Sequence, residues 1–293
     1  MSVGVRSVRS RGRMARLSRV VWPRNDALRT SIIILIGLVV FAIVGKLLLV
    51  DPTKQVLRDS YLRPGSPGHL LGTDPLGRDI LAWCAAGVLT SLAICALVVA
   101  LSMLIGVSVG LVSGYSRSWV DHGLMRITDL QLAIPPLPLF IAASAIVAGS
   151  IYSVVILVSF VSWVPYARLV RARVLVERER GYIAAARLAG SRTWRILLLH
   201  LLPAAATEIL VLASLQAGTV LLIESGLSFL GLGLQPPNTS LGYMISVGRT
   251  DPVGSWWVVV FPGIMIVLLV LAFNLMGDGL RDLLKADVEG YTR

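Results

Sequence analysis

The sequence predicts an all-α integral membrane protein with six transmembrane helices. Of the 293 residues, 56% are hydrophobic and only 15% are charged, and the mean hydropathy is +0.80. A water-soluble domain cannot cover that much apolar surface with polar groups. Six apolar segments of about 20 residues or more are each long enough to cross the hydrocarbon core of a bilayer. The predicted spans are residues 31–50, 88–113, 124–147, 152–170, 204–223 and 256–276.

The first span follows a basic segment, residues 1–30, which holds eight arginines and one acid, Asp26. A basic start before an apolar run is also typical of a signal peptide, but this basic segment is long. The residues after the span, 51–54, do not resemble a small-residue cleavage site. The sequence therefore predicts an uncleaved first helix with a cytoplasmic N-terminus, and residues 31–87 form this helix and an extracytoplasmic loop.

The distribution of positive charge predicts the orientation of all six spans. With the N-terminus inside, the cytoplasmic segments 1–30, 115–126, 168–203 and 277–293 contain 21 lysines and arginines, against 5 in the outer segments. This bias follows the positive-inside rule and places both termini in the cytoplasm. The net charge of +11 therefore reflects membrane topology, and we expect no nucleic-acid partner.

The second and third spans carry two local signals. Gly106 and Gly110 in the second span form a small-xxx-small pair, which permits close helix packing. The third span contains Pro135, Pro136 and Pro138, which remove helix donors and predict a break. The break either lines the translocation pathway or is an ordinary packed kink.

Charged residues in or beside the spans are few. Asp129, placed on the pathway together with the three prolines, is expected to pair with Arg126 at i, i+3. Glu208, one turn into the fifth span, is interpreted as an acid favoured by the helix dipole, with a coupling-ion role as the less favoured alternative. Cys84 and Cys95 are expected to be packing residues, because one helix would hold them too far apart for a disulfide.

The longest cytoplasmic loop, residues 176–203, predicts a helix, a turn and a second helix. Tyr182, Ala185, Ala186 and Ala189 recur at helical spacing and form one shallow apolar stripe. Gly190 fits the position after the helix, where a positive φ is required. Ser191 or Thr193 is expected to cap the second helix, and Pro203 to start the fifth span. The residues alone leave open whether this loop lies on anionic lipid or contacts a protein partner.

Motifs for chemistry are absent from the sequence. It has no phosphate-binding G-x-x-x-x-G-K-[ST] loop, no H-E-x-x-H or C-x-x-C metal motif and no G-x-S-x-G nucleophile elbow. No selectivity filter or arginine ladder marks a channel. These absences favour a passage-forming protein that is not an enzyme and whose energy source lies in another chain.

The spacing in the cytoplasmic loop resembles the EAA loop of ABC importer permeases, which contacts the ATPase subunit. The matching positions are Ala184, Ala185, Ala186, Gly190, Leu202 and Pro203. Two positions depart from the family pattern, because Ala184 stands where Glu is usual and His200 where Ile is usual. Glu177, two turns earlier on roughly the same face, is the candidate substitute for the missing acid.

Three further motifs resemble the DppC/OppC branch of the dipeptide, oligopeptide and nickel importer family. They are His69-Leu-Leu-Gly-Thr-Asp-Pro-Leu-Gly-Arg-Asp79, Ser228-Phe-Leu-Gly-Leu-Gly233 with Gln235-Pro-Pro237, and Ala272-Phe-Asn-Leu-Met-Gly-Asp-Gly-Leu-Arg-Asp282. The first two motifs lie in outer segments, and a structural role is expected for both rather than substrate contact. Gly72 and Gly77 shape the first segment, which Asp74, Arg78 and Asp79 hold by polar contacts.

The resemblance implies a type I importer permease with a MetI-like core over residues 88–277 and a cytoplasmic tail over residues 278–293. It implies a bacterial cell-membrane location, a second homologous permease, two ATPase subunits that hold ATP and Mg²⁺, an extracytoplasmic binding protein and a peptide substrate moved by alternating access. The residues that this resemblance assigns to ATPase coupling are the six EAA positions and Tyr182. A nickel or other small-solute importer is the alternative within the family. A stand-alone channel or carrier and a membrane scaffold are the alternatives outside it.

Overall fold

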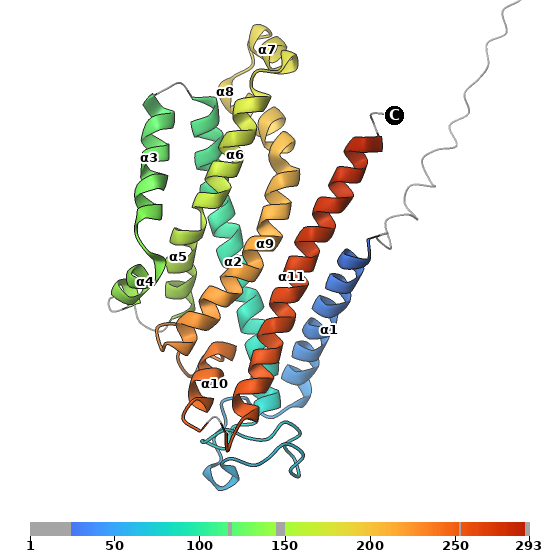
Figure 1. Ribbon diagram of the computed structural model, residues 1–293, viewed down its shortest axis with the longest axis vertical. Helices are drawn as coiled ribbons and strands as arrows, with labels where there is room; N and C mark the ends of the chain where they lie inside the picture. Colours follow the sequence, from blue (N-terminus) through green and yellow to red (C-terminus); the bar gives the residue numbers. More distant parts are fainter. Residues whose placement is uncertain (1–24, 117–118, 145–149, 252, 291–293) are drawn as a thin grey trace, which may run out of the picture.

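The computed structural model describes residues 25–116, 119–144, 150–251 and 253–290. Most of the predicted basic segment, residues 1–24, lies outside these ranges, as do residues 291–293 of the predicted tail. The described residues form a bundle of long helices with loops at both ends (Figure 1). The helices are α1 (Asp26–Leu48), α2 (Ile80–Tyr115), α3 (Trp119–Ala133), α4 (Pro136–Ser144), α5 (Ile151–Ser162), α6 (Val164–Glu177), α7 (Gly181–Leu188), α8 (Thr193–Ile196), α9 (Leu202–Phe229), α10 (Leu241–Gly248) and α11 (Trp257–Gly290), with a 3-10 turn at Leu57–Asp59 and a π-helix at Leu197–Leu201.

Five helical segments within the described residues are long and apolar enough to cross a membrane, and the number is six if the bent pair of α3 and α4 is one span. This agrees with the predicted all-α fold of six spans. The α3–α4 pair is bent by 83° at its break, so the three prolines produce a sharp turn rather than a mild kink. The N-terminus of α1 and the C-terminus of α11 point to the end of the bundle that carries α7, and residues 51–79 and α10 lie at the opposite end (Figure 1).

Predicted boundaries differ from the structure at the second and fourth spans in particular, and one short helix was not predicted. The second span begins at Ile80 rather than residue 88, because the Asp79 carboxylate caps the helix by accepting the Ala82 N–H at 2.9 Å. The fourth span extends beyond residue 170, since α5 and α6 together reach Glu177. α10, a short helix in the outer segment, was not predicted; it starts at Leu241 and is capped by Ser240, whose hydroxyl accepts the Tyr243 N–H.

α9 starts at Leu202 with Pro203 in its first turn, as expected, but it does not start after a break, because helical structure is continuous over Thr193–Phe229. A proline inside a helix lacks an N–H donor, and its ring clashes with the carbonyl four residues earlier. Here a π-helical turn over Leu197–Leu201 directly precedes Leu202 and Pro203. The wider turn accommodates the proline without ending the helix.

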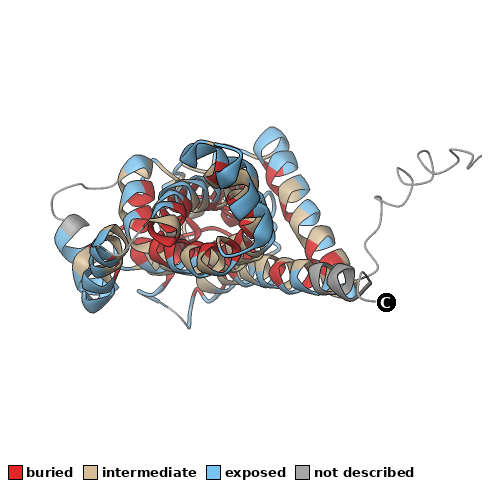
Figure 2. Cartoon of the chain, turned by 90° about the horizontal axis from the view of Figure 1, so that it is seen from above, coloured by how far each residue is buried: buried red, intermediate tan, exposed pale blue. Residues whose placement is uncertain are grey.

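The centre of the bundle is the contact between α2 and α6. A Cβ added to Gly106 would lie 2.6 Å from Tyr166 Cβ, and one added to Gly110 would lie 2.6 Å from the Ala167 carbonyl oxygen. Gly114 continues the same stripe one turn later, against Val174. The predicted small-xxx-small packing is therefore confirmed and extends over three glycines. Seen along the bundle, buried residues lie on the faces turned inward and exposed residues on the faces turned outward (Figure 2).

α1 lies at the edge of the bundle and packs against α2 and α11. Close contacts at both of its ends hold it there, because Gly45 lies against Ala85 and Leu28 lies against Gly279. The remaining surface of α1 is apolar and exposed, and includes Ile36, Val40 and Leu47. This exposed stripe is typical of a helix that faces lipid.

The loop between α1 and α2 is held by buried polar contacts, as the motif at 69–79 predicts. Gly72 and Gly77 adopt positive φ angles of 80° and 71°. Arg78 Nε donates to Asp74 Oδ2 at 2.6 Å, and both side chains are buried. The guanidinium also lies 4.5 Å from the centre of the Trp83 ring, so the loop is fixed to the start of α2.

Candidate functional site

The candidate coupling loop has the predicted helix–turn–helix form. α7 ends at Leu188, and Gly190 follows with a φ of 75°. The Gly190 N–H donates to the Arg187 carbonyl at 3.0 Å, and the Ser191 N–H donates to the Ala186 carbonyl at 3.1 Å. This pair of hydrogen bonds is a Schellman motif. The second helix starts differently from the prediction, since Arg192 occupies its N-cap position and no side chain caps it.

One residue anchors α7 to the rest of the chain. Ile183 is fully buried and belongs to an apolar cluster with residues of α2, α6 and α9. Most of the predicted stripe points elsewhere: Tyr182, Ala185 and Ala189 are exposed, and Ala186 is half-buried. Leu188 is 89% exposed. α7 therefore presents a small apolar surface that no described residue covers.

Glu177 lies beneath α7 and does not replace the acid missing at Ala184. Its side chain is 5% exposed and accepts a hydrogen bond from the Tyr182 hydroxyl at 2.6 Å. Arg180 Nε lies 3.2 Å from the same carboxylate. Burial and this hydrogen bond to Glu177 raise the pKa of Tyr182 above its ordinary value. Glu177 thus points inward and fixes the first turn of α7, whereas Ala184 is exposed.

Arg173 on α6 extends this network to α9. Its guanidinium lies 3.7 Å from Glu177 and 3.6 Å from Glu208, and its Nε donates to the Ala204 carbonyl at 3.3 Å. Glu208, which sequence reasoning assigned to the helix dipole, therefore has a specific cationic partner. Charged and polar contacts thus connect α7, α6 and the start of α9. The residues that form them are Tyr182, Glu177, Arg173 and Glu208.

The candidate pathway residues lie on the bent α3–α4 pair. Asp129 pairs with Arg168 of α6 at 2.6 Å, so the expected local pair with Arg126 is replaced by a contact between helices. Pro135, Pro136 and Pro138 are all exposed at the break. The Gln131 side-chain amide donates a hydrogen bond to the Phe160 carbonyl and accepts one from Trp163 Nε1 at 2.8 Å. The bent segment is thus attached to α5 and α6 by polar groups, and its prolines face outward.

A buried acid at the opposite end of the bundle was missed by sequence reasoning. Glu224 lies one residue beyond the predicted fifth span, but α9 continues past it, and only 1% of it is exposed. Its carboxylate accepts hydrogen bonds from four serine hydroxyls at 3.0 to 3.4 Å. The donors are Ser91, Ser225, Ser228 and Ser240. The signal that could have revealed it is the cluster of serines in and around the Ser228–Gly233 motif.

Two of the four serines, Ser228 and Ser240, also hold the backbone of the outer segment. The Ser228 hydroxyl, bound to Glu224, also accepts the Leu234 N–H at 3.2 Å. The Ser240 hydroxyl, bound to the same carboxylate, accepts the Tyr243 N–H and so caps α10. One carboxylate therefore fixes both ends of the 230–240 segment. This geometry agrees with the structural role expected for the motif.

These features define a class of protein, a multi-span helical membrane protein with a sharply bent span and an exposed helix–turn–helix at one end. A family model described as "Binding-protein-dependent transport system inner membrane component" matches residues 106–290. The chain belongs to this family and is a permease subunit of a bacterial transport system.

Several relatives are similar over most of the chain. A di/tripeptide transport system permease protein of Pseudomonas aeruginosa is 41% identical over 240 residues, which cover 80% of this chain and 79% of the relative. A glutathione transport system permease protein of Pectobacterium atrosepticum is 43% identical over 219 residues, covering 75% and 73%. A dipeptide transport system permease protein of Alkalihalophilus pseudofirmus is 36% identical over 261 residues, covering 89% and 86%. These similarities support the DppC branch of the family.

Proposed function

We propose that this chain forms half of the translocation pathway of an ATP-driven importer of short peptides. The other half is a second, homologous permease subunit, and an extracytoplasmic binding protein delivers the substrate. Two ATPase subunits hold ATP and Mg²⁺, and this chain contributes no catalytic group. The transport of di- and tripeptides and of glutathione, for which these relatives are named, supports a peptide substrate.

The observation that carries the coupling mechanism is the exposed surface of α7 on a rigid base. Tyr182, Ala185 and Leu188 are open to a partner, while Ile183 and Glu177 fix the helix to the bundle. An ATPase that binds this surface would move α7 together with α6 and α9, since Arg173 joins them. Rigid-body movement of these helices is the step that alternates access between the two sides. Ala184, Ala186, Gly190, Leu202 and Pro203 complete the proposed coupling region.

We assign the bent α3–α4 pair, with Asp129, Pro135, Pro136 and Pro138, to the translocation pathway. The 83° break supports this assignment, since non-helical backbone at membrane depth is stable only where it is packed in protein or lines a cavity. We place the chain in the bacterial inner membrane with both termini on the cytoplasmic side. The split of 21 to 5 positive residues supports this orientation.

Reconstitution of the complete complex in liposomes tests the proposal. We expect ATP-dependent uptake of dipeptides and tripeptides, and no uptake by this chain alone. Uptake of nickel in place of peptides would favour the alternative within the family. Uptake by the chain alone, without ATP, would instead identify a channel or secondary carrier.

The coupling surface is tested in the same assay with two variants at one position. Ala185→Arg places a long cation on the proposed docking surface, and we expect uptake to fall at least tenfold. Ala185→Ser changes the size of the side chain little and serves as the matched control. Equal uptake by the two variants would exclude this face of α7 as the ATPase contact.

A further inference from the structure

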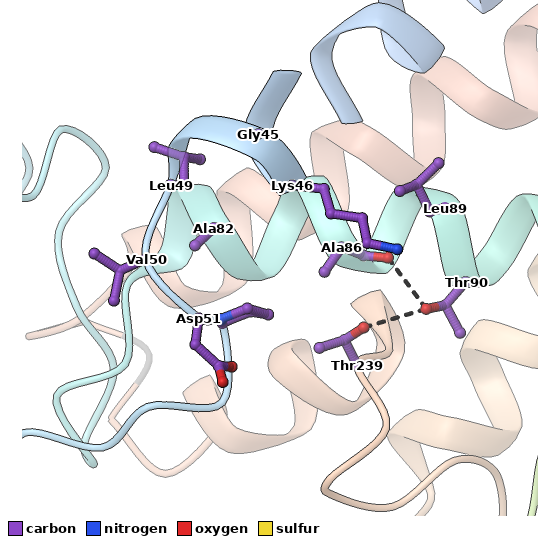
Figure 3. A pocket seen from close by; sticks show the side chains of 11 residues that line it. Gly45, Lys46, Leu49, Val50, Asp51, Ala82, Ala86, Leu89, Thr90 and Thr239 are labelled. Carbon is purple, nitrogen blue, oxygen red and sulfur yellow. Dashed lines mark hydrogen bonds between the residues drawn. The ribbon is translucent and has the colours of Figure 1, made fainter. Parts of the chain in front are cut away.

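A pocket of about 390 Å³ lies between the end of α1, the start of α2 and the segment before α10. Its lining includes Lys46 and Asp51, the hydroxyls of Thr90 and Thr239, and apolar side chains of both helices (Figure 3). It lies at the end of the bundle opposite α7, outside the coupling loop and the α3–α4 bend. Nothing in the proposed transport cycle uses it.

Lys46 is an exposed cation on the helix edge that faces lipid. It lies in the last turn of α1, between the exposed apolar residues Val44 and Leu47. Within the described residues, Lys46 forms no ion pair. A lysine near the end of a spanning helix extends its ammonium to the level of the lipid headgroups. The side chain runs along α2 toward Thr90 (Figure 3).

Asp51 supplies the opposite charge at the other side of the same pocket (Figure 3). Its Oδ1 accepts hydrogen bonds from the Thr53 hydroxyl at 2.6 Å and the Thr53 N–H at 2.8 Å. These hydrogen bonds lower the pKa of Asp51, so the carboxylate is ionised at neutral pH. Lys46 and Asp51 thus line one cavity and carry opposite charges, and no ion pair joins them.

Two threonine hydroxyls also line the pocket, on the side toward which Lys46 runs. Thr90 Oγ1 donates to the Ala86 carbonyl oxygen at 3.1 Å and lies 3.2 Å from Thr239 Oγ1. The single proton of Thr90 is used in this bond, whereas the Thr239 hydroxyl can donate to an anionic oxygen. The pocket therefore offers a cation and a hydroxyl at one side and a carboxylate at the other, which fits a zwitterionic ligand.

We propose that this pocket binds the headgroup of an ethanolamine phospholipid, with its phosphate at Lys46 and its ammonium at Asp51. The lipid-facing stripe of α1 below the pocket provides the surface for the acyl chains. An ethanolamine headgroup carries N–H donors for the carboxylate, which a choline headgroup lacks. A glycerol headgroup supplies the phosphate without a cation. The bound lipid joins the peripheral helix α1 to α2 and to the segment that holds α10.

Competition among lipids tests this site. The full chain, in its assembled complex, is placed in nanodiscs with equal amounts of ethanolamine, choline and glycerol phospholipids, and retained lipids are identified by native mass spectrometry. We expect ethanolamine lipid to be retained about fivefold over choline lipid, the ratio expected for one hydrogen bond to an exposed carboxylate, since choline carries the same charge but no N–H donor. Equal retention of the two lipids would overturn the proposal.

Single variants test the roles of Lys46 and Asp51 separately. Asp51→Asn should abolish the preference for ethanolamine over choline, and Lys46→Met should reduce retention of both about fivefold. Lys46→Arg keeps the charge and should retain the lipid, which excludes a folding defect. Lys54→Met removes a nearby exposed lysine outside the pocket and should change nothing. Unchanged selectivity in Asp51→Asn would overturn the assignment of the ammonium.

Soluble phosphoethanolamine distinguishes the lipid from a free solute of the same chemistry. We expect it to leave lipid retention unchanged at equal concentration, because it lacks the acyl chains that lie along α1. Displacement of the lipid by an equal amount of the soluble compound would show a solute site instead.

Discussion

Gly190 carries the strictest conformational demand in the coupling loop. Its φ of 75° is far from the value near −65° that proline requires, and its N–H is needed for the turn. Gly190→Pro should therefore destroy the Schellman motif and misplace α7 relative to α8. We expect ATP-dependent uptake by the reconstituted complex to fall at least tenfold.

Gly181→Ala is the matched control at the other end of α7. No heavy atom lies within 4 Å of a Cβ added there, and its φ is not positive, so this variant should keep uptake within about twofold. Retention of wild-type uptake by Gly190→Pro would contradict the proposed role of the turn.

Glu224 gives a prediction about stability rather than coupling. Glu224→Leu would leave four serine hydroxyls without their acceptor, and we expect it to lower the free energy of unfolding by about 3 kcal/mol. Glu224→Gln keeps an acceptor oxygen and should cost about 1 kcal/mol. Thermal unfolding of the purified chain in detergent measures both. Equal losses for the two variants would show that the hydrogen bonds contribute little.

The acids show how far single residues could be interpreted from the sequence. The polar contacts of Asp74 and Asp79 were predicted, because both lie in a short motif with turn residues and their partners are close in sequence. The polar contacts of Glu224 and Glu177 were not predicted, since their partners lie on several helices. A carboxylate bonded by serines from α2, α9 and the start of α10 leaves no local pattern.

At the level of elements, the contact between α2 and α6 depends on the absence of side chains at three glycines. Gly110→Val should force the helices apart, because a Cβ alone would already lie 2.6 Å from the Ala167 carbonyl oxygen. We expect a loss of stability of about 3 kcal/mol or more and little folded protein. The yield of folded chain after size-exclusion chromatography measures this effect.

Gly37→Val on α1 is the control for the glycine substitution. It makes the same chemical change in a spanning helix, but no heavy atom lies within 4 Å of the added Cβ. We expect its folded yield to match the wild type. A similar loss in both variants would mean that valine itself, rather than close packing at Gly110, lowers the yield.

The helices were predictable from hydropathy because each span needs an apolar run of sufficient length. Their ends and junctions were harder to predict. Leu202-Pro203 indicates a helix start, yet the π-helical turn before it allows one helix to continue. Three prolines indicate a break, but the 83° angle also reflects how each half packs, since Asp129 of α3 pairs with Arg168 and Phe140 of α4 is buried in the main apolar cluster. Such contacts between helices are set by tertiary packing.

At the scale of the whole molecule, one continuous helix joins the two ends of the bundle. Residues 193–229 number 37, a length of about 55 Å at 1.5 Å per residue. One end adjoins the turn after α7, and the other carries Glu224 and the outer segment. A movement of α7 therefore reaches the 230–248 region through a single helix rather than through a chain of separate contacts.

The proposed orientation gives a prediction for the whole chain. Leu70, in the α1–α2 loop, is 72% exposed, and Arg281, near the end of α11, is also exposed. If both termini face the cytoplasm, a membrane-impermeant maleimide should label Leu70→Cys in intact spheroplasts. Arg281→Cys should react only in inverted membrane vesicles or after permeabilisation. The background is low, because the native Cys84 and Cys95 are both buried. The wild-type chain is the control, and labelling of Arg281→Cys in intact spheroplasts would reverse the topology and place α7 outside, where no ATPase could reach it.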